Sequence, residues 1–362
     1  MNRSLSFLPL ALVAVLVAGC PQKKDSPSSP NVNDDVWVAT DAGPARLILE
    51  GDTAWVVNNT ANSVDAVDLT TCGETQGSCD LLGTVNLAVG SAPFDGAVAS
   101  GRLHVVLSGF GFAAVDTIDT GTRQVVATIT TGAGALYSPQ AVAVAGGQIF
   151  IADSNFYGSG PGFLAMVTGT AITGSTQSTQ LQPGAFSLLP NGNLAVTNTG
   201  LVDFGDFGDP NDDVVTQPGG IDIVNPTTGA IVENIDLGLV APVGRLVVDG
   251  NSGYVVSATE GTLLKVDMTT GTFVEIAVTE TGSFLTWTEV VDGKLYVLAS
   301  AEDLIYVFDA ETGAPLDPIR VGPGGDTAKE PSHIAVWEDG NGVTHLLVTM
   351  YAANSVSDVV LP

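Results

Sequence analysis

A group of acidic residues between Thr199 and Gly219 is the part of this 362-residue chain best suited to hold a metal ion. Five carboxylates so close in sequence repel one another unless water or a cation screens them. Calcium accepts about six to eight oxygen ligands from such loops, although the spacing here does not match an EF-hand loop. The candidate ligands are Asp203, Asp206, Asp209, Asn211, Asp212 and Asp213. Three interpretations stay open: a Ca²⁺ site, a solvated surface loop, and a loop that binds a partner.

Other residue patterns argue against a familiar catalytic centre. The chain has three histidines, and no Ser-His-Asp order, zinc-ligand spacing, phosphate-binding glycine loop or nucleotide fingerprint accompanies them. His104 and His345 fall inside apolar stretches, so we expect them to be packed or surface residues of strands. His333 could act as a general base only if it faced a channel. The sequence therefore favours binding over catalysis.

The chain repeats a unit made of a strand, a tight turn and a second strand, and this unit must position the candidate residues. In the clearest copy, 138–152, Val142 and Val144 alternate with small residues, and Gly146-Gly147 supplies two positive φ angles for a hairpin. The turn glycines recur roughly every 43 to 58 residues, a period close to that of four-stranded propeller blades. The other six copies begin at Pro44, Pro93, Pro183, Pro242, Ser283 and Pro331.

The two ends of the chain indicate how the array closes. A strand at 36–40 belongs to no complete unit of its own, and the last unit has three strands before the chain stops. If the first strand completes the last blade, the ring closes and no sheet edge is exposed. We therefore predict an all-β fold: one β-propeller over residues 35–362, with seven four-stranded blades closed by the N-terminal strand. Six or eight blades are the alternatives.

Two stretches share a more specific pattern: an apolar strand, an asparagine-containing turn, Asn-Ser-Val, and a strand that ends near an aspartate. They are residues 54–68 and 347–359, and both resemble the YVTN-type (NHL/YncE-like) propeller repeat. Several third strands end in Asp or Asn shortly before Thr-Gly, where the side chain can bond the backbone two residues on. The resemblance implies a propeller and leaves function open, because propellers host many chemistries.

Propeller geometry predicts where a ligand would bind. The residues at the start of each innermost strand should surround the mouth of the central channel: Arg46, Asp95, Gln140, Arg245 and His333. Two arginines there could receive an anion, or they could pair with Asp95 and other acids. The longest irregular segments, including the acidic insertion, gather on the same face, where propellers usually bind ligands.

The first twenty residues resemble a bacterial lipoprotein signal peptide. Arg3 is followed by an apolar run, 5–17, that is too short for an ordinary spanning helix. Val17-Ala18-Gly19-Cys20 resembles a lipobox, which implies cleavage before Cys20 and attachment to the membrane through its lipid; the alternative is a secretory signal with a chance cysteine. The residue after Cys20 is not Asp, which favours the outer over the inner membrane. Residues 21–34 are too polar to bury and form a disordered tether.

Cys72 and Cys79 lie outside the cytoplasm if this signal is used, and disulfides persist there. A disulfide would close a small loop and stabilise the fold by about 2–3 kcal/mol at most. A thiol metal site would need about four ligands, and no other cysteine or nearby histidine is available. We interpret the pair as a structural disulfide rather than a metal or redox pair.

The formal charge of −28 disfavours nucleic acid as a partner and favours divalent cations or basic partners. We expect a lipid-anchored binding or scaffold propeller of the cell envelope. Its protein or small-molecule partner would bind the loop-rich face, without catalysis; a subunit of a larger envelope assembly would look the same. The alternative is a metal-dependent hydrolase that is similar to lactonase-type propellers. That resemblance implies a divalent cation in the channel. The residues that would correspond to its ligands are Asp41, Asn58, Asp153 and Asn198.

Overall fold

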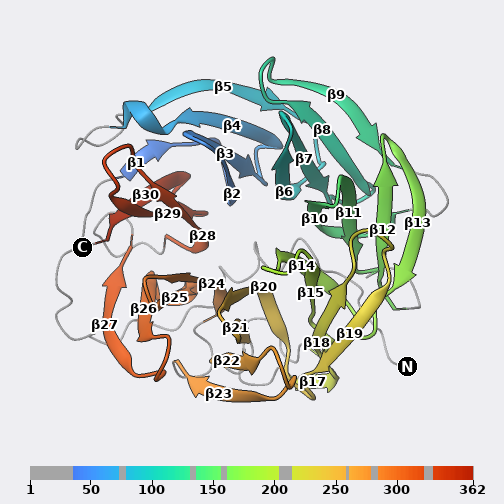
Figure 1. Ribbon diagram of the computed structural model, residues 1–362. Helices are drawn as coiled ribbons and strands as arrows, with labels where there is room; N and C mark the ends of the chain where they lie inside the picture. Colours follow the sequence, from blue (N-terminus) through green and yellow to red (C-terminus); the bar gives the residue numbers. More distant parts are fainter. Residues whose placement is uncertain are drawn as a thin grey trace, which may run out of the picture.

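Seven four-stranded antiparallel sheets stand around a central axis in the computed structural model (Figure 1). The structure describes residues 36–72, 79–130, 136–155, 161–203, 214–257, 261–278, 284–321 and 329–361. The predicted all-β, seven-bladed propeller is confirmed. In the described part of the chain, no helix is long and apolar enough to cross a membrane.

Blades 1 to 3 follow one another in sequence, each with its innermost strand first. Blade 1 contains β2 (Pro44–Glu50), β3 (Thr53–Asn58), β4 (Ser63–Asp68) and β5 (Asp80–Asn86). Blade 2 contains β6 (Pro93–Ala99), β7 (Arg102–Leu107), β8 (Ala114–Asp119) and β9 (Gln124–Ile129). Blade 3 contains β10 (Pro139–Ala145), β11 (Gln148–Asp153), β12 (Phe163–Thr168) and β13 (Ala171–Gln177).

Blades 4 to 7 repeat this order, with one insertion. Blade 4 contains β14 (Pro183–Leu188), β15 (Leu194–Asn198), β18 (Gly220–Val224) and β19 (Ile231–Asp236), and its insertion forms a separate sheet of β16 (Leu201–Asp203) and β17 (Val214–Gln217). Blade 5 contains β20 (Pro242–Asp249), β21 (Ser252–Ser257), β22 (Thr262–Asp267) and β23 (Phe273–Ala277). Blade 6 contains β24 (Leu285–Val291), β25 (Lys294–Ala299), β26 (Leu304–Asp309) and β27 (Pro315–Arg320). Blade 7 contains β28 (Pro331–Glu338), β29 (Thr344–Met350), β30 (Ser355–Val360) and β1 (Val36–Ala39). Two short 3-10 helices, η1 (Leu69–Thr71) and η2 (Ser300–Glu302), follow β4 and β25.

The ring closes as predicted, because β1 pairs antiparallel with β30 and lies beside it in Figure 1. Val38 lies opposite Val356 and is buried in a cluster that includes Leu47 of blade 1 and Leu347 of blade 7. Apolar side chains form such a cluster at every junction between neighbouring blades, so one blade covers the face of the next. The N-terminal strand thus joins both ends of the fold.

The predicted turns are confirmed. Gly146 and Gly147 have φ angles of 57° and 77°, the two positive values that a two-residue hairpin of this type needs. At the end of β22, Asp267 Oδ1 accepts hydrogen bonds from the backbone N–H groups of Thr269 at 2.8 Å and Thr270 at 3.2 Å. The aspartate at the end of a third strand therefore fixes the turn that follows it, as the repeat pattern indicates.

The asparagine of each Asn-Ser-Val segment fastens one blade to the start of the next. Asn62 of blade 1 and Asn354 of blade 7 have positive φ angles of 57° and 51°, which asparagine tolerates better than most residues. Asn62 Oδ1 accepts from Ala92 N and Asn354 Oδ1 accepts from Gly43 N, both at 2.9 Å. Both acceptors hold the backbone just before an innermost strand begins.

Every innermost strand shifts its register within its first few residues. The shifts fall between Pro44 and Arg46, Pro93 and Gly96, Pro139 and Ala141, Pro183 and Ala185, Val243 and Val247, Leu285 and Trp287, and Pro331 and His333. A bulge of this kind bends a strand and redirects the side chains beside it. Arg46, Trp287 and His333 each directly follow such a shift.

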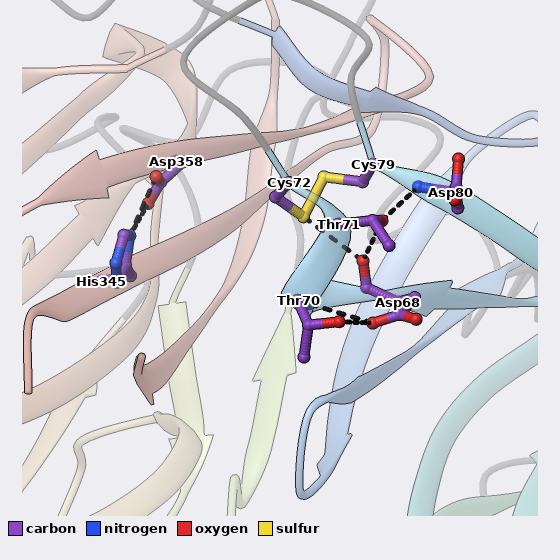
Figure 2. Close-up of a disulfide and its surroundings, with 8 residues drawn as sticks. All are labelled: Asp68, Thr70, Thr71, Cys72, Cys79, Asp80, His345 and Asp358. Atoms are coloured by element: carbon purple, nitrogen blue, oxygen red, sulfur yellow. Dashed lines mark hydrogen bonds and ion pairs between the residues drawn. A yellow bond between two sulfur atoms is a disulfide. The ribbon is translucent and has the colours of Figure 1, made fainter. Parts of the chain in front are cut away.

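The predicted disulfide joins Cys72, after η1, to Cys79, just before β5 (Figure 2). Asp68 Oδ1 accepts from Thr70 N at 2.9 Å and holds the start of η1, and Asp80 N donates to Thr71 Oγ1 at 2.7 Å. Cys79 packs in the cluster that contains Val38, so the disulfide stands at the junction where the ring closes.

Candidate functional site

The innermost strands enclose a cavity of about 290 Å³ at the axis of the propeller. Four of the five residues expected at the channel mouth line it: Arg46, Asp95, Arg245 and His333. Gln140 does not line this cavity, because its Nε2 donates to Ser138 O, Ser138 Oγ and Ser108 Oγ instead. The other lining residues include Ile48 and Phe186, which are partly exposed, and Val142 and Ile334, which are buried in the packing between blades.

Arg46 and Asp95 form a buried ion pair between blades 1 and 2. Arg46 Nε lies 2.7 Å from Asp95 Oδ1, and the two side chains are 10% and 12% exposed. Asp95 Oδ2 also accepts a hydrogen bond from Val142 N at 3.1 Å, so the carboxylate connects to blade 3. Burial lowers the pKa of the Arg46 guanidinium, and the charge of Asp95 opposes that shift. The sequence left open whether Arg46 receives an anion or pairs with an acid such as Asp95, and the structure shows the pair.

Arg245 pairs with Glu289, an acid that sequence reasoning missed. One terminal nitrogen of Arg245 donates to both carboxylate oxygens of Glu289 at 2.6 Å, and Trp287 Nε1 donates to Glu289 Oε1 at 2.8 Å. The Glu289 side chain is 5% exposed, whereas that of Arg245 is 41% exposed. Arg245 therefore combines a fixed contact with a surface open to the channel.

Trp287 is the aromatic centre of the site. The Arg46 guanidinium carbon lies 4.1 Å from the Trp287 ring centroid and that of Arg245 lies 5.7 Å from it, both within the range of cation–π contacts. The His333 ring centroid lies 4.3 Å from that of Trp287. One indole thus organises both cations and the histidine.

His333 is a buried histidine held in its neutral form. Its Nδ1 is buried and has no hydrogen-bond partner among the described residues. Burial lowers the pKa of His333 well below its usual value, and the positive charges of Arg46 and Arg245 lower it further. His333 therefore offers an uncharged nitrogen beside two guanidinium groups.

Trp287 carried a signal that could have revealed it, and Glu289 lies two residues further along the same strand. Trp287 is the third residue of its innermost strand, as Arg46, Asp95 and His333 are of theirs. Blade 6 begins that strand with Leu285 rather than the proline that opens the other innermost strands, which hides the correspondence. Aligning the seven strand starts would have brought Trp287 into the set.

Most of the candidate calcium ligands lie outside the described residues. Asp203 ends β16 and is exposed, whereas Asp206, Asp209, Asn211, Asp212 and Asp213 fall in residues 204–213, which the structure does not describe. Within the described ranges, no group of three or more His, Cys, Asp or Glu side chains is placed to hold a metal ion.

The positions compared with lactonase-type ligands are engaged within their own blades. Asn58 Nδ2 donates to Asp65 Oδ2 and Asn198 Nδ2 donates to Asp222 Oδ2, each at 2.9 Å. Asp153 accepts from the backbone of Tyr137, Ser138 and Asn155, and burial raises its pKa.

None of Asp41, Asn58, Asp153 and Asn198 lines the channel cavity. Asp41 is also engaged in blade 1, because its Oδ2 accepts a hydrogen bond from Ser63 Oγ at 2.8 Å.

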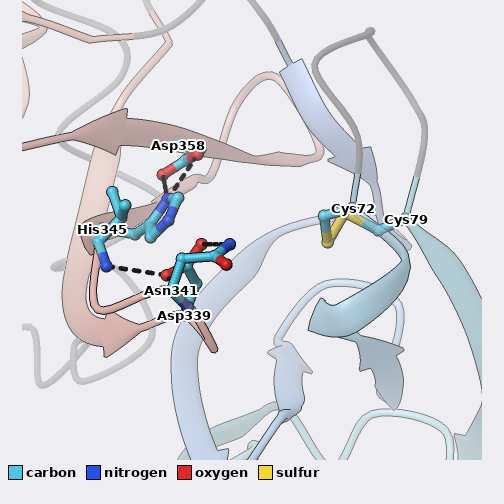
Figure 3. A network of polar contacts seen from close by, with 7 residues as sticks. Cys72, Cys79, Asp339, Asn341, His345 and Asp358 are labelled. Carbon is cyan, nitrogen blue, oxygen red and sulfur yellow. Dashed lines mark hydrogen bonds and ion pairs between the residues drawn. A yellow bond between two sulfur atoms is a disulfide. The ribbon is translucent and has the colours of Figure 1, made fainter.

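The two remaining histidines lie inside strands, as expected. His104 in β7 is buried, and its Nδ1 lies 3.0 Å from Thr117 Oγ1. His345 in β29 has Nδ1 2.9 Å from Asp358 Oδ2 and packs its ring against Trp337 (Figure 3). Burial raises the pKa of Asp358, and the contact with His345 opposes the shift. Both histidines belong to blade packing and not to the channel.

No family model and no curated protein matches this chain. Solved structures resemble it over nearly its full length. Hydrazine synthase of Kuenenia stuttgartiensis is 16% identical with a TM-score of 0.68, covering 90% of this chain and 97% of that one. A catalytically inactive virginiamycin B lyase from Staphylococcus aureus, with quinupristin, is 13% identical with a TM-score of 0.65, covering 92% and 99%. The WD40 β-propeller domain of Doa1 is 11% identical with a TM-score of 0.61, covering 90% and 95%.

At such low identities the likeness establishes the fold alone. The class of protein is therefore a seven-bladed β-propeller, here with a charged and aromatic cluster at its axis. The similar structures include enzymes as well as a WD40 domain, so function has to be argued from the site itself.

Proposed function

We propose that this protein is a lipid-anchored, extracytoplasmic binding propeller that takes a small molecule into the mouth of its channel. One observation carries the proposal: two arginines, two acids, a tryptophan and a neutral histidine surround a single cavity. Burying charges costs several kcal/mol per ion unless the geometry compensates for it. Apolar side chains could have filled the axis at lower cost, so this cluster is better explained as a ligand site than as packing.

The repeat pattern supports a YVTN-type propeller. The equivalent asparagines Asn62 and Asn354 both accept a backbone hydrogen bond from the segment that leads into the next blade. A shared structural role at equivalent positions is the property expected of a true repeat. This membership rests on the chain's internal pattern.

The anchor is the second part of the proposal. Lipidation of Cys20 and a polar tether, residues 21–34, would hold the propeller at the cell envelope, most simply at the outer membrane. Cys20→Ser should prevent labelling of the protein by radioactive palmitate and move it from the membrane fraction to the soluble fraction. An unchanged membrane fraction would refute anchoring through this residue.

The binding function can be tested with the full chain purified in a non-ionic detergent. A collection of small cationic, neutral and anionic compounds should contain some that raise the unfolding temperature, because a ligand that binds only the folded state stabilises it. Arg245→Gln should abolish those shifts. Arg102→Gln is a matched control, because Arg102 pairs with Asp119 away from the cavity and its side chain is similarly exposed, at 43%. Shifts that survive in Arg245→Gln would place binding elsewhere.

The calcium site and the metal-dependent hydrolase stay predictions. Unfolding of the same protein with calcium and with a chelator tests both, since a bound cation raises the midpoint. A shift that Asp206→Ala and Asp209→Ala remove would assign calcium to the acidic insertion, and a shift that they leave intact would favour a cation in the channel. No shift at millimolar calcium would refute both.

A further inference from the structure

We infer that the channel cavity recognises its ligand through a carboxylate group attached to a small apolar body. The inference rests on the proposed binding function and adds the chemistry of the ligand. It follows from which hydrogen-bonding groups around the cavity are already used and which are not.

The acceptors of the site are occupied. Glu289 receives hydrogen bonds on both oxygens from Arg245 and a further one from Trp287 Nε1. Asp95 has Arg46 Nε at 2.7 Å from one oxygen and accepts from Val142 N on the other. Every oxygen of the two carboxylates already has a donor, so a cationic or donor-rich ligand would have to share these oxygens with existing contacts.

The donors of the site are in excess. A guanidinium has about five N–H groups, and only one nitrogen of Arg245 donates to Glu289. Arg245 Nε has no acceptor among the described residues. The terminal nitrogens of Arg46 make no hydrogen bond to a described residue. Buried donors without acceptors are costly, so a ligand that supplies acceptors is favoured.

His333 adds an independent observation. This residue is 5% exposed, it lines the cavity, and its Nδ1 lacks a partner within the described part of the chain. A neutral imidazole has one N–H donor and one acceptor nitrogen, so it can donate to an oxygen of a ligand without adding charge. Together, His333 and the two arginines offer donors from three different blades to one ligand.

Charge and size narrow the choice among anions. The two arginines and two acids sum to zero formal charge, in a chain of net charge −28. One negative charge is easier to accommodate there than the nearly two charges of a phosphate ester. The cavity volume of about 290 Å³ restricts the ligand to a small molecule. Ile48 and Phe186 are partly exposed beside the charged groups, and this apolar part of the wall suits a short hydrocarbon or a single ring.

The test compares carboxylic acids with their amides, which have nearly the same shape. Butyrate and benzoate are titrated calorimetrically into the full chain in non-ionic detergent, beside butyramide, benzamide and inorganic phosphate. We expect each carboxylate to bind at least about tenfold more tightly than its amide, because charge-assisted hydrogen bonds are about twice as strong as neutral ones. Arg245→Gln should weaken the carboxylates by at least about tenfold, and Arg102→Gln should change them less than about twofold.

Each outcome separates the ligand class from the binding function. Amides that bind as tightly as the acids, with loss in Arg245→Gln, would overturn the carboxylate and leave the binding propeller intact. Phosphate that binds more tightly than both acids would also overturn the carboxylate. If none of these probes binds while other compounds raise the unfolding temperature through Arg245, the ligand is not a small carboxylate. If no compound binds at all, both the carboxylate ligand and the binding function are refuted. If Arg245→Gln loses its native circular dichroism, Arg245→Lys serves instead. Wild-type affinity for the carboxylates in that folded variant would refute recognition through the several N–H groups of the Arg245 guanidinium.

Discussion

Replacing Asp95 by leucine should destabilise the propeller far more than removing an exposed ion pair. The substitution leaves the Arg46 guanidinium, 10% exposed, without its counter-ion and leaves Val142 N without an acceptor. Two unit charges about 4 Å apart attract by about 4 kcal/mol at an effective dielectric constant of about 20. Measured costs of breaking one side of a buried pair are about 3–5 kcal/mol. We expect a loss of that size in the free energy of unfolding.

The loss can be read as a melting temperature. An unfolding entropy of about 2.1 cal/mol/K per residue over residues 36–361 converts about 3–5 kcal/mol into a decrease of about 4–7 °C. The melting temperature of Asp95→Asn, which keeps an oxygen for Val142 N, should decrease less than that of Asp95→Leu. The double variant Arg46→Met with Asp95→Leu should recover most of the lost melting temperature. Arg102→Gln should cost no more than about 1 kcal/mol. If Asp95→Leu melts within a degree of Arg102→Gln, the reasoning about a buried pair is refuted.

Four further outcomes test the fold. Val38→Asp, which places a charge at the closing junction, should melt several degrees lower and expose β1 to protease in limited proteolysis. Cys72→Ser should lower the free energy of unfolding by about 2–3 kcal/mol, a difference that reduction of the parent abolishes. Burial raises the pKa of Asp116 above its ordinary 3.8, so the charged form of Asp116 lowers the stability of the fold as the pH rises above that value. Asp116→Asn still accepts a hydrogen bond from Thr128. In urea unfolding this variant should be more stable than the parent at pH 7 and equal to it at pH 3. Asn354→Gly should cost about 1 kcal/mol for its lost hydrogen bond, and Asn354→Ala should cost more because the backbone there has a positive φ.

The fold could be predicted because its determinants are local. Glycine pairs such as Gly146-Gly147 specify a hairpin whatever surrounds them, and third-strand aspartates such as Asp267 specify the next turn. Closure followed from counting strands at both ends, which needs no knowledge of contacts. The third strand of blade 3 lacks this signal, because β12 ends in Thr168 rather than the usual aspartate, yet β12 pairs with β11 and β13 all the same. The β16–β17 sheet was not expected, since β16 has three residues and no strong pattern.

The site was only partly predictable because its pairings are not local. The start of an innermost strand identifies Arg46 and Arg245 as channel residues, but it does not say which acid each will meet. Arg245 finds its partner 44 positions away in the next blade, and that depends on the rotation from one blade to the next. Gln140 shows the converse: it begins an innermost strand, yet the nearby Ser138 captures its amide. Sequence position selects the strand, and local hydrogen bonds decide which side chains remain for the cavity.

Ring closure and the channel site depend on each other. Arg46 and His333 come from blades 1 and 7, which are neighbours only because β1 seals the ring. The hydrogen bonds across that junction include those from Gly43 N to Asn354 Oδ1 at 2.9 Å and from Ser332 Oγ to Pro44 O at 3.0 Å. A ligand that bonds both Arg46 and His333 would cross the same junction, so binding free energy would add directly to the stability of closure. The junction that closes the ring is thereby also a place where a ligand can help to hold the ring shut.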